Sequence, residues 1–192
     1  VVPTLEISQY VNIAHGKYNY SGSVYGIPLK EMEMLGYKTE QGDFKKYGER
    51  NACFFGKDII QYFSDVQGNS PKYKYDENYN ISESEFDFMK DTFTINAKNQ
   101  QGSDDSSNYA PPNDDNNTDN KNQTAGGTQK LNVIGTLKQT SNDYEASNAI
   151  FIDLDRAKQL VSESNRLSSV KNYKLSYSSI NVYCDDTKSV SE

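Results

Sequence analysis

Two apolar runs and a helical pattern dominate the C-terminal half of the chain. Residues 131–137 are rich in β-branched side chains, which predicts a strand, and residues 149–152 are continuously apolar, as in a strand covered on both faces. From Leu154 onward apolar positions recur at helical spacing, which predicts an amphipathic helix with Asp153 as its N-cap. Residues 173–185 alternate again. Strand, helix and strand in this order predict a βαβ crossover with parallel strands.

Shorter strand patterns fill the N-terminal half. Residues 1–8 predict one strand, and residues 11–14 and 18–27 predict a strand pair about a turn at His15 and Gly16. The remaining predicted elements are a short helix over 30–35 closed by Gly36, a buried strand over 52–55, a helix that buries Ile59, Ile60 and Phe63, a loop over 66–85, and a strand or bent pair over 86–95. Together these elements predict an α+β fold.

A polar tract interrupts this pattern. Residues 98–129 consist almost entirely of Asn, Asp, Gln, Ser, Thr and Gly, so they cannot bury enough apolar surface to offset the entropy lost on ordering. Because strands are predicted on both sides of it, we interpret the tract as a disordered insertion and not as a domain boundary.

Composition limits the partners of the chain. Only 34% of its 192 residues are hydrophobic, as expected if part of the chain lies outside any core. The formal net charge of -7 disfavours a nucleic-acid partner, since phosphate binding needs a basic surface, and disfavours an anionic membrane surface similarly. No apolar run approaches the ~20 residues of a membrane-spanning helix. The chain opens without Met or a signal peptide, which suggests an excised fragment.

The residue types that carry catalysis or bind metals are sparse. Cys53 and Cys184 are the only cysteines; we interpret them as buried free thiols, with a single disulfide bridge as the alternative. His15 is the only histidine and lies in a predicted solvated turn, without a nucleophile or an orienting carboxylate nearby in the sequence. One histidine and two distant cysteines are too few for a zinc site. We therefore expect no catalytic residue, no metal site and no bound cofactor.

Tyrosine is abundant, with 15 residues. Six tyrosines could line a surface that stacks on sugars or peptides: Tyr18, Tyr20, Tyr25, Tyr73, Tyr75 and Tyr79. The alternative is that they are half-buried strand residues, because tyrosine is a good strand former. The sequence leaves both interpretations open.

Two segments of the chain together resemble a known family. In the first, Gly42 and Phe44 precede a buried strand, Gly56 and a helical segment that ends at Phe63. In the second, the strand VIGTL at residues 133–137 precedes the strand and helix AIFIDLDRAKQL. Their order and spacing resemble the extracytoplasmic domain of MacB-like and FtsX-like ABC transporter permeases over nearly the whole chain. The polar insertion, the many tyrosines and the lack of an initial strand and helix depart from that family's pattern.

The resemblance implies a fold in two parts. Residues 1–8 and 149–192 would form a membrane-proximal mixed α/β part, and residues 9–148 a β-rich outer lobe that includes the insertion. The chain would be the soluble, excised ectodomain of a permease in the cell membrane, on its extracytoplasmic side. The Asn-rich, Trp-free composition is compatible with a Gram-positive bacterium.

The same resemblance implies a non-catalytic role. The domain would relay ATP-driven motion to a peptide-like substrate that is exported or to an extracellular accessory protein. Resistance to antimicrobial peptides is one role that this export would serve. ATP would bind to a cytoplasmic ATPase partner, and a second permease copy would complete the transporter. The alternative function is a cell-surface module that binds carbohydrate or a host ligand through a tyrosine-rich β lobe. A hydrolase is disfavoured because the sequence offers no pairing of a nucleophile with a base.

Overall fold

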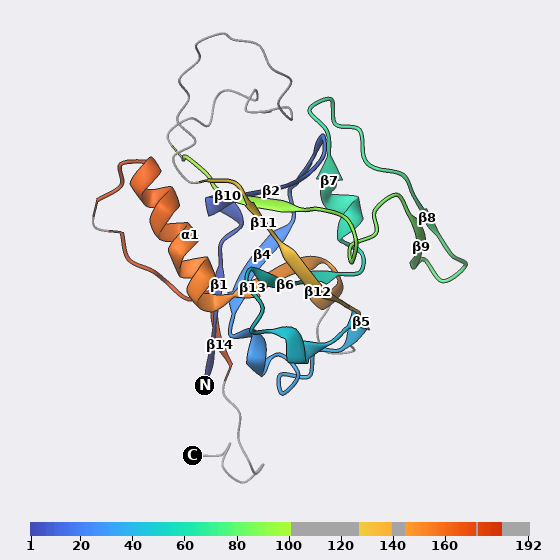
Figure 1. Cartoon of the computed structure of the whole chain (residues 1–192), viewed down its shortest axis with the longest axis horizontal. Helices are drawn as coiled ribbons and strands as arrows, with labels where there is room; N and C mark the ends of the chain where they lie inside the picture. Colours follow the sequence, from blue (N-terminus) through green and yellow to red (C-terminus); the bar gives the residue numbers. More distant parts are fainter. Residues whose placement is uncertain (101–126, 140–144, 172, 182–192) are drawn as a thin grey trace.

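The computed structural model describes residues 1–100, 127–139, 145–171 and 173–181. Within these ranges the chain forms one α-helix, α1 (Leu154–Leu167), and 14 strands in three sheets. Figure 1 shows α1 on one side of the molecule and a two-stranded hairpin projecting from the other side. The mixed α/β class predicted from the sequence is confirmed.

Seven strands form the largest sheet, in the order β14-β1-β4-β13-β6-β12-β5. They are β1 (Val2–Glu6), β4 (Ser23–Ile27), β5 (Thr39–Gly42), β6 (Ala52–Gly56), β12 (Asn132–Leu137), β13 (Ala149–Asp153) and β14 (Ser179–Asn181). This sheet contains strands from both parts predicted from the sequence, and the division of the chain into those two parts stays a prediction.

A second sheet of five strands has the order β11-β10-β2-β3-β7. It consists of β2 (Val11–His15), β3 (Tyr18–Tyr20), β7 (Phe63–Ser64), β10 (Thr94–Ala97) and β11 (Gln129–Lys130). The projecting hairpin pairs β8 (Tyr73–Tyr75) with β9 (Ile81–Ser84). Five 3₁₀ turns complete the described chain: η1 (Ser8–Tyr10), η2 (Leu29–Glu31), η3 (Phe44–Lys46), η4 (Ile59–Tyr62) and η5 (Glu145–Ser147).

The seven-stranded sheet is buried on both faces. In β13, Ile150 and Ile152 belong to the core that the sheet shares with α1 and the five-stranded sheet, while Phe151 packs into a second cluster with Phe54 of β6. Successive strand residues point to opposite faces, so a strand covered on both sides needs apolar residues at every position. The prediction for residues 149–152 is therefore confirmed, with its physical reason.

The predicted βαβ crossover is present, but its second strand begins later than predicted, at Ser179 and not at Tyr173. β13 is parallel to β4, β4 is antiparallel to β1, and β1 is antiparallel to β14, so β13 and β14 run in the same direction with two strands between them. Asp153 is the N-cap of α1, as predicted, and its carboxylate accepts a hydrogen bond from the N–H of Asp155 at 3.0 Å. The helix buries its apolar face: Leu154, Ala157, Leu160 and Val161.

The single strand predicted over residues 18–27 is wrong in its extent. The segment contains two strands, because β3 ends at Tyr20 in the five-stranded sheet and β4 begins at Ser23 in the seven-stranded sheet. Gly22 lies at the break against the ring of Tyr20, where a Cβ atom would clash. The sequence pattern continued across a point at which the chain changes sheets.

Several short elements also differ from the prediction. The helices predicted over 30–35 and 59–63 are 3₁₀ turns, η2 and η4, and Gly36 closes the turns after η2 with φ of +86°. The strand predicted over 86–95 begins only at Thr94. Phe86 and Phe93 are buried although neither lies in a strand. The predicted loop at 66–85 contains the β8–β9 hairpin.

Some predictions lie outside the described residues. These are the disorder predicted for most of residues 98–129 and the environment of Cys184.

The close approach of α1 to the sheet generates a stability test. A Cβ atom at Gly26 would collide with the Cβ of Ala157, so Gly26→Ala should push the helix away from β4. We expect the free energy of unfolding, measured by chemical denaturation, to fall by about 1–3 kcal/mol. Gly48→Ala is the control, because a Cβ atom there meets nothing within 4 Å. Equal effects of the two substitutions would contradict the proposed packing.

Candidate partner-binding surface

The β8–β9 hairpin carries two exposed tyrosine side chains. Tyr73 and Tyr75 contact each other edge to face with ring centroids 5.5 Å apart, and Tyr79 lies in the turn between the strands. Tyr75 is 51% exposed and Tyr79 is 87% exposed. Tyr73 is partly buried and packs against the hydrophobic core, so Tyr75 and Tyr79 supply the exposed rings. We call Tyr73, Tyr75 and Tyr79 the hairpin tyrosines.

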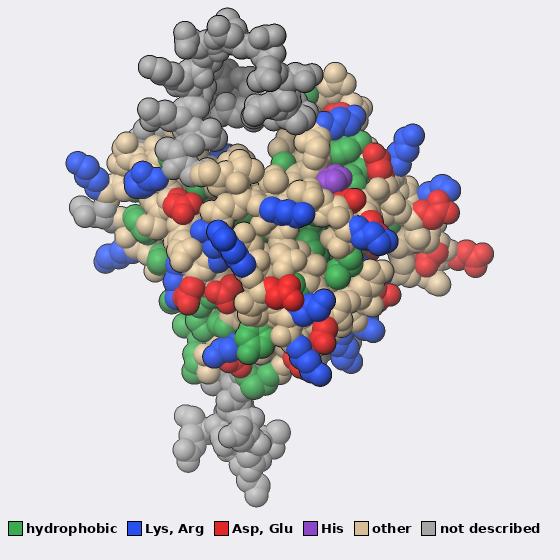
Figure 2. Space-filling view, in the orientation of Figure 1, with side chains coloured by type: hydrophobic (Ala, Val, Ile, Leu, Met, Phe, Trp, Pro, Cys, Tyr) green, Lys and Arg blue, Asp and Glu red, His purple; other side chains and the backbone are tan. Residues whose placement is uncertain are grey.

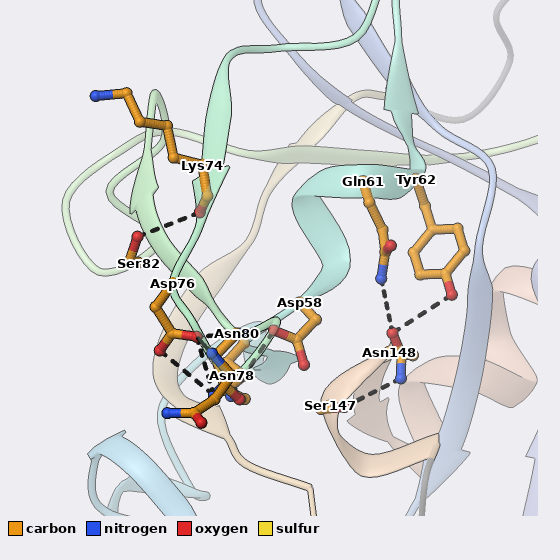
Figure 3. Close-up of polar contacts among 11 residues, drawn as sticks. Asp58, Gln61, Tyr62, Lys74, Asp76, Asn78, Asn80, Ser82, Ser147 and Asn148 are labelled. Carbon is orange, nitrogen blue, oxygen red and sulfur yellow. Dashed lines mark hydrogen bonds and ion pairs between the residues drawn. The ribbon is translucent and has the colours of Figure 1, made fainter.

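The turn of the hairpin is held by one carboxylate. Oδ1 of Asp76 accepts hydrogen bonds from the backbone N–H groups of Asn78 (2.8 Å) and Asn80 (2.9 Å), as Figure 3 shows. The N–H of Asp76 donates in turn to the carbonyl of Asn80 at 2.8 Å. These bonds favour the ionised form and lower the pKa of Asp76, the bond from Asn80 having the largest effect.

Tyr79 has an unusual backbone conformation within this turn. Its φ of +62° lies in the left-handed region, which glycine and asparagine adopt more readily than a residue with a bulky side chain. The hydrogen bonds of Asp76 hold that conformation. The turn therefore presents an exposed ring from a fixed backbone, which is how aromatic side chains contribute most to protein interfaces.

A lysine connects the hairpin to the body of the molecule. Lys57 is the residue that follows β6. Its Nζ donates to Oδ1 of Asn80 at 2.9 Å and lies 3.9 Å from the carboxylate of Asp58. Burial raises the pKa of Asp58, an effect that Lys57 and Ser147 oppose. The turn of the hairpin is thus held against the end of β6.

Asn148 joins the segments beneath the hairpin. Its Oδ1 accepts hydrogen bonds from Nε2 of Gln61 (2.9 Å) and from the hydroxyl of Tyr62 (3.4 Å), and its Nδ2 donates to Oγ of Ser147 at 3.0 Å (Figure 3). The N–H of Asp58 donates to the carbonyl of Ser147 at 2.8 Å. These bonds connect η5 with η4. The cluster joins the segment before β13 to the segment after β6, and no periodic sequence signal marks it.

The other three predicted tyrosines do not join the hairpin tyrosines in one surface. Tyr18 and Tyr20 of β3 pack against the larger core cluster, whereas Tyr25 packs against Phe151 in the other cluster, with ring centroids 5.7 Å apart. The hydroxyl of Tyr20 donates to the carbonyls of Ser23 (3.1 Å) and Asn148 (3.2 Å), and burial raises the pKa of Tyr20. These three tyrosines are partly buried strand residues.

His15 and Cys53 both have packed surroundings. The ring of His15 lies 4.5 Å from the ring of Phe86 and 4.7 Å from that of Phe93, between centroids, so His15 is not the free solvated residue that the sequence predicted. Cys53 is a buried free thiol, and burial raises its pKa. In the described part of the chain, no group of three or more His, Cys, Asp or Glu side chains is arranged to hold a metal ion.

Comparison with known proteins gives likenesses to solved structures only. No protein-family model and no curated protein matches the chain. Among solved structures, the extracellular domain of the noncanonic ABC-type transporter YknZ from Gram-positive bacteria is similar at 12% sequence identity and a TM-score of 0.38. The likeness covers 82% of this chain and 56% of that structure, and at this TM-score it carries no argument about function. In the described ranges, α1 is too short and too polar to cross a bilayer.

The division of the tyrosines into two groups generates a test. Tyr20→Phe removes a donor from two carbonyls in a largely buried site, so the free energy of unfolding should fall by about 1 kcal/mol. Tyr79→Phe, the matched control on the exposed turn, should change it by less than about 0.5 kcal/mol. Denaturant titration of the two variants measures both values. A larger loss for Tyr79→Phe would overturn the assignment.

Proposed function

We propose that this chain is the extracellular domain of a MacB-like ABC transporter permease, without catalytic activity of its own. The observation that carries this proposal is the antiparallel pairing of β1 with β14, in which Val2 lies opposite Asn181. The chain therefore enters and leaves the seven-stranded sheet on adjacent strands, which lie about 4.8 Å apart in a sheet. This arrangement suits a domain inserted between two membrane helices, because the start of β1 and the end of β14 lie at the same end of the sheet. The sequence resemblance supports the same proposal independently.

The domain acts as a mechanical relay in this proposal. ATP binding and hydrolysis by a cytoplasmic ATPase move the membrane helices, and β1 and β14 receive that motion. The tight contact between α1 and Gly26 of β4 makes the helix and the sheet move together. Residues 1–8 and 149–192 form the membrane-proximal part, residues 9–148 form the outer lobe, and a second permease copy completes the transporter.

The hairpin tyrosines contact the partner outside the cell. An extracellular accessory protein or a peptide-like substrate fits a projecting hairpin with exposed rings, because aromatic side chains are favoured at interface centres. In this proposal the cell membrane is that of a Gram-positive bacterium, and export of a peptide-like substrate or antimicrobial peptide resistance is the outcome.

The second candidate function is a cell-surface binding module with no transporter attached. The exposure of Tyr75 and Tyr79 on a held turn favours it, since stacked aromatic rings also bind carbohydrate. In that case the membrane helices on either side of the domain would be absent.

The parent reading frame separates the two functions. A permease requires apolar spans of about twenty residues before Val1 and soon after Glu192, and two more near its C-terminus. We expect sequencing of the frame to find these four spans. A frame with a signal peptide and without these spans would reject the transporter and favour the binding module.

A further inference from the structure

The connection between α1 and β14 carries positive charge. From Ser164 to Cys184 the sequence contains Arg166, Lys171 and Lys174 and no acidic residue, although the whole chain has a formal net charge of -7. The negative average charge therefore conceals local segments of positive charge, of which this is one. We call residues 170, 171 and 173–180 the basic strap.

The basic strap also exposes apolar side chains. Tyr173, Leu175 and Tyr177 alternate along it and are between 39% and 44% exposed. Ile180, in β14, is 58% exposed. Lys171 and Lys174 are exposed among them, and neither forms an ion pair with a carboxylate in the described ranges. Surfaces that contact the interfacial region of a bilayer typically combine lysine, tyrosine and exposed aliphatic side chains.

The strap is fixed to the body of the molecule at its end. The N–H of Ser178 donates to the carbonyl of Thr4 at 2.8 Å, and Oγ of Ser178 accepts from the N–H of Glu6 at 2.7 Å. Before Ser178 the strap borders an open hollow of about 490 Å³, whose other walls include Leu5, Glu6 and Val161. The apolar side chains of the strap are therefore partly covered by the body of the molecule and partly open to solvent.

The strap leads to the place where the chain enters the fold. β14 pairs with β1, so Ile180 lies opposite Pro3 at this end of the sheet. Figure 2 shows hydrophobic side chains gathered at the end of the molecule where β1 and β14 lie, and Lys and Arg side chains projecting along the flank formed by α1 and the strap.

We propose that the basic strap binds the surface of an anionic lipid bilayer. Charge complementarity selects this occupant: the lysines attract anionic headgroups, while Tyr173, Leu175 and Tyr177 enter the interfacial region. The inference rests on the proposed function in one respect, since that function places β1 and β14 next to a membrane. The proposal departs from the expectation based on net charge, because membrane attraction acts locally, within a Debye length of about 8–10 Å.

The hairpin tyrosines provide an internal contrast. Tyr79 is more exposed than any apolar residue of the strap, but Asp76, Glu77 and Glu83 accompany it on the hairpin. Acidic side chains repel anionic headgroups. If exposed apolar side chains were sufficient, both the hairpin and the strap would bind a bilayer. Because only the strap is basic, we expect only the strap to bind an anionic bilayer.

Single tryptophans can report which surface meets lipid, because the chain contains no Trp. Tyr177→Trp and Tyr79→Trp are compared with vesicles of phosphatidylcholine alone and with vesicles containing phosphatidylglycerol, at low ionic strength. We expect a blue shift and protection from acrylamide quenching for Tyr177→Trp with the anionic vesicles only. An unchanged spectrum for Tyr177→Trp, or an equal shift for both variants, would overturn the proposal.

A second measurement keeps the native tyrosines. Lys171→Gln combined with Lys174→Gln should weaken cosedimentation with the anionic vesicles about thirty-fold, since each basic residue near the surface contributes to binding. The matched control is Lys72→Gln combined with Lys74→Gln on the hairpin, which should leave cosedimentation unchanged. Equal losses for the two pairs would reject a strap-specific site. Vesicle binding by a chain whose reading frame lacks membrane spans would reject the transporter and retain the lipid surface.

Discussion

The central strands β6 and β13 bury side chains on both faces of the seven-stranded sheet, so each face of that sheet needs a hydrophobic cover. On one face the cover is α1 with the five-stranded sheet, and on the other it includes Leu29 and Met32 around η2. Because the covers must close over the sheet, the hairpin and the strap are left at the periphery. The two surfaces available for partners are therefore consequences of how the core is enclosed.

Much of this core could be predicted from the sequence. A short run without polar residues, such as residues 149–152, predicts a strand that is buried on both faces. Asp153 precedes apolar residues at helical spacing, which predicts the start of a helix. The breaks between elements were harder to predict. The chain leaves one sheet for another at Gly22, and Phe86 and Phe88 have a strand-like spacing although neither lies in a strand. Both features depend on contacts between residues distant in the sequence.

The candidate surfaces could be predicted only in part. Tyrosine content pointed to six residues, but exposure depends on which strand face meets the core, and this separates Tyr20 and Tyr25 from Tyr79. The strained turn at Tyr79 has no sequence signal, since glycine is the residue expected there. Net charge similarly describes the whole surface and conceals the basic strap, which becomes significant once its side chains are found exposed beside β1.

The central claim is that the end of the sheet formed by β1 and β14 faces a membrane while the hairpin points into the extracellular space. Whole-cell labelling of full-length Tyr79→Cys, in a Cys184→Ser background, with a membrane-impermeant maleimide tests it most directly. Cys53 should stay silent because it is buried and its pKa is raised. The account predicts that intact cells label residue 79 as fully as lysed cells do. Labelling that appears only after lysis would contradict it.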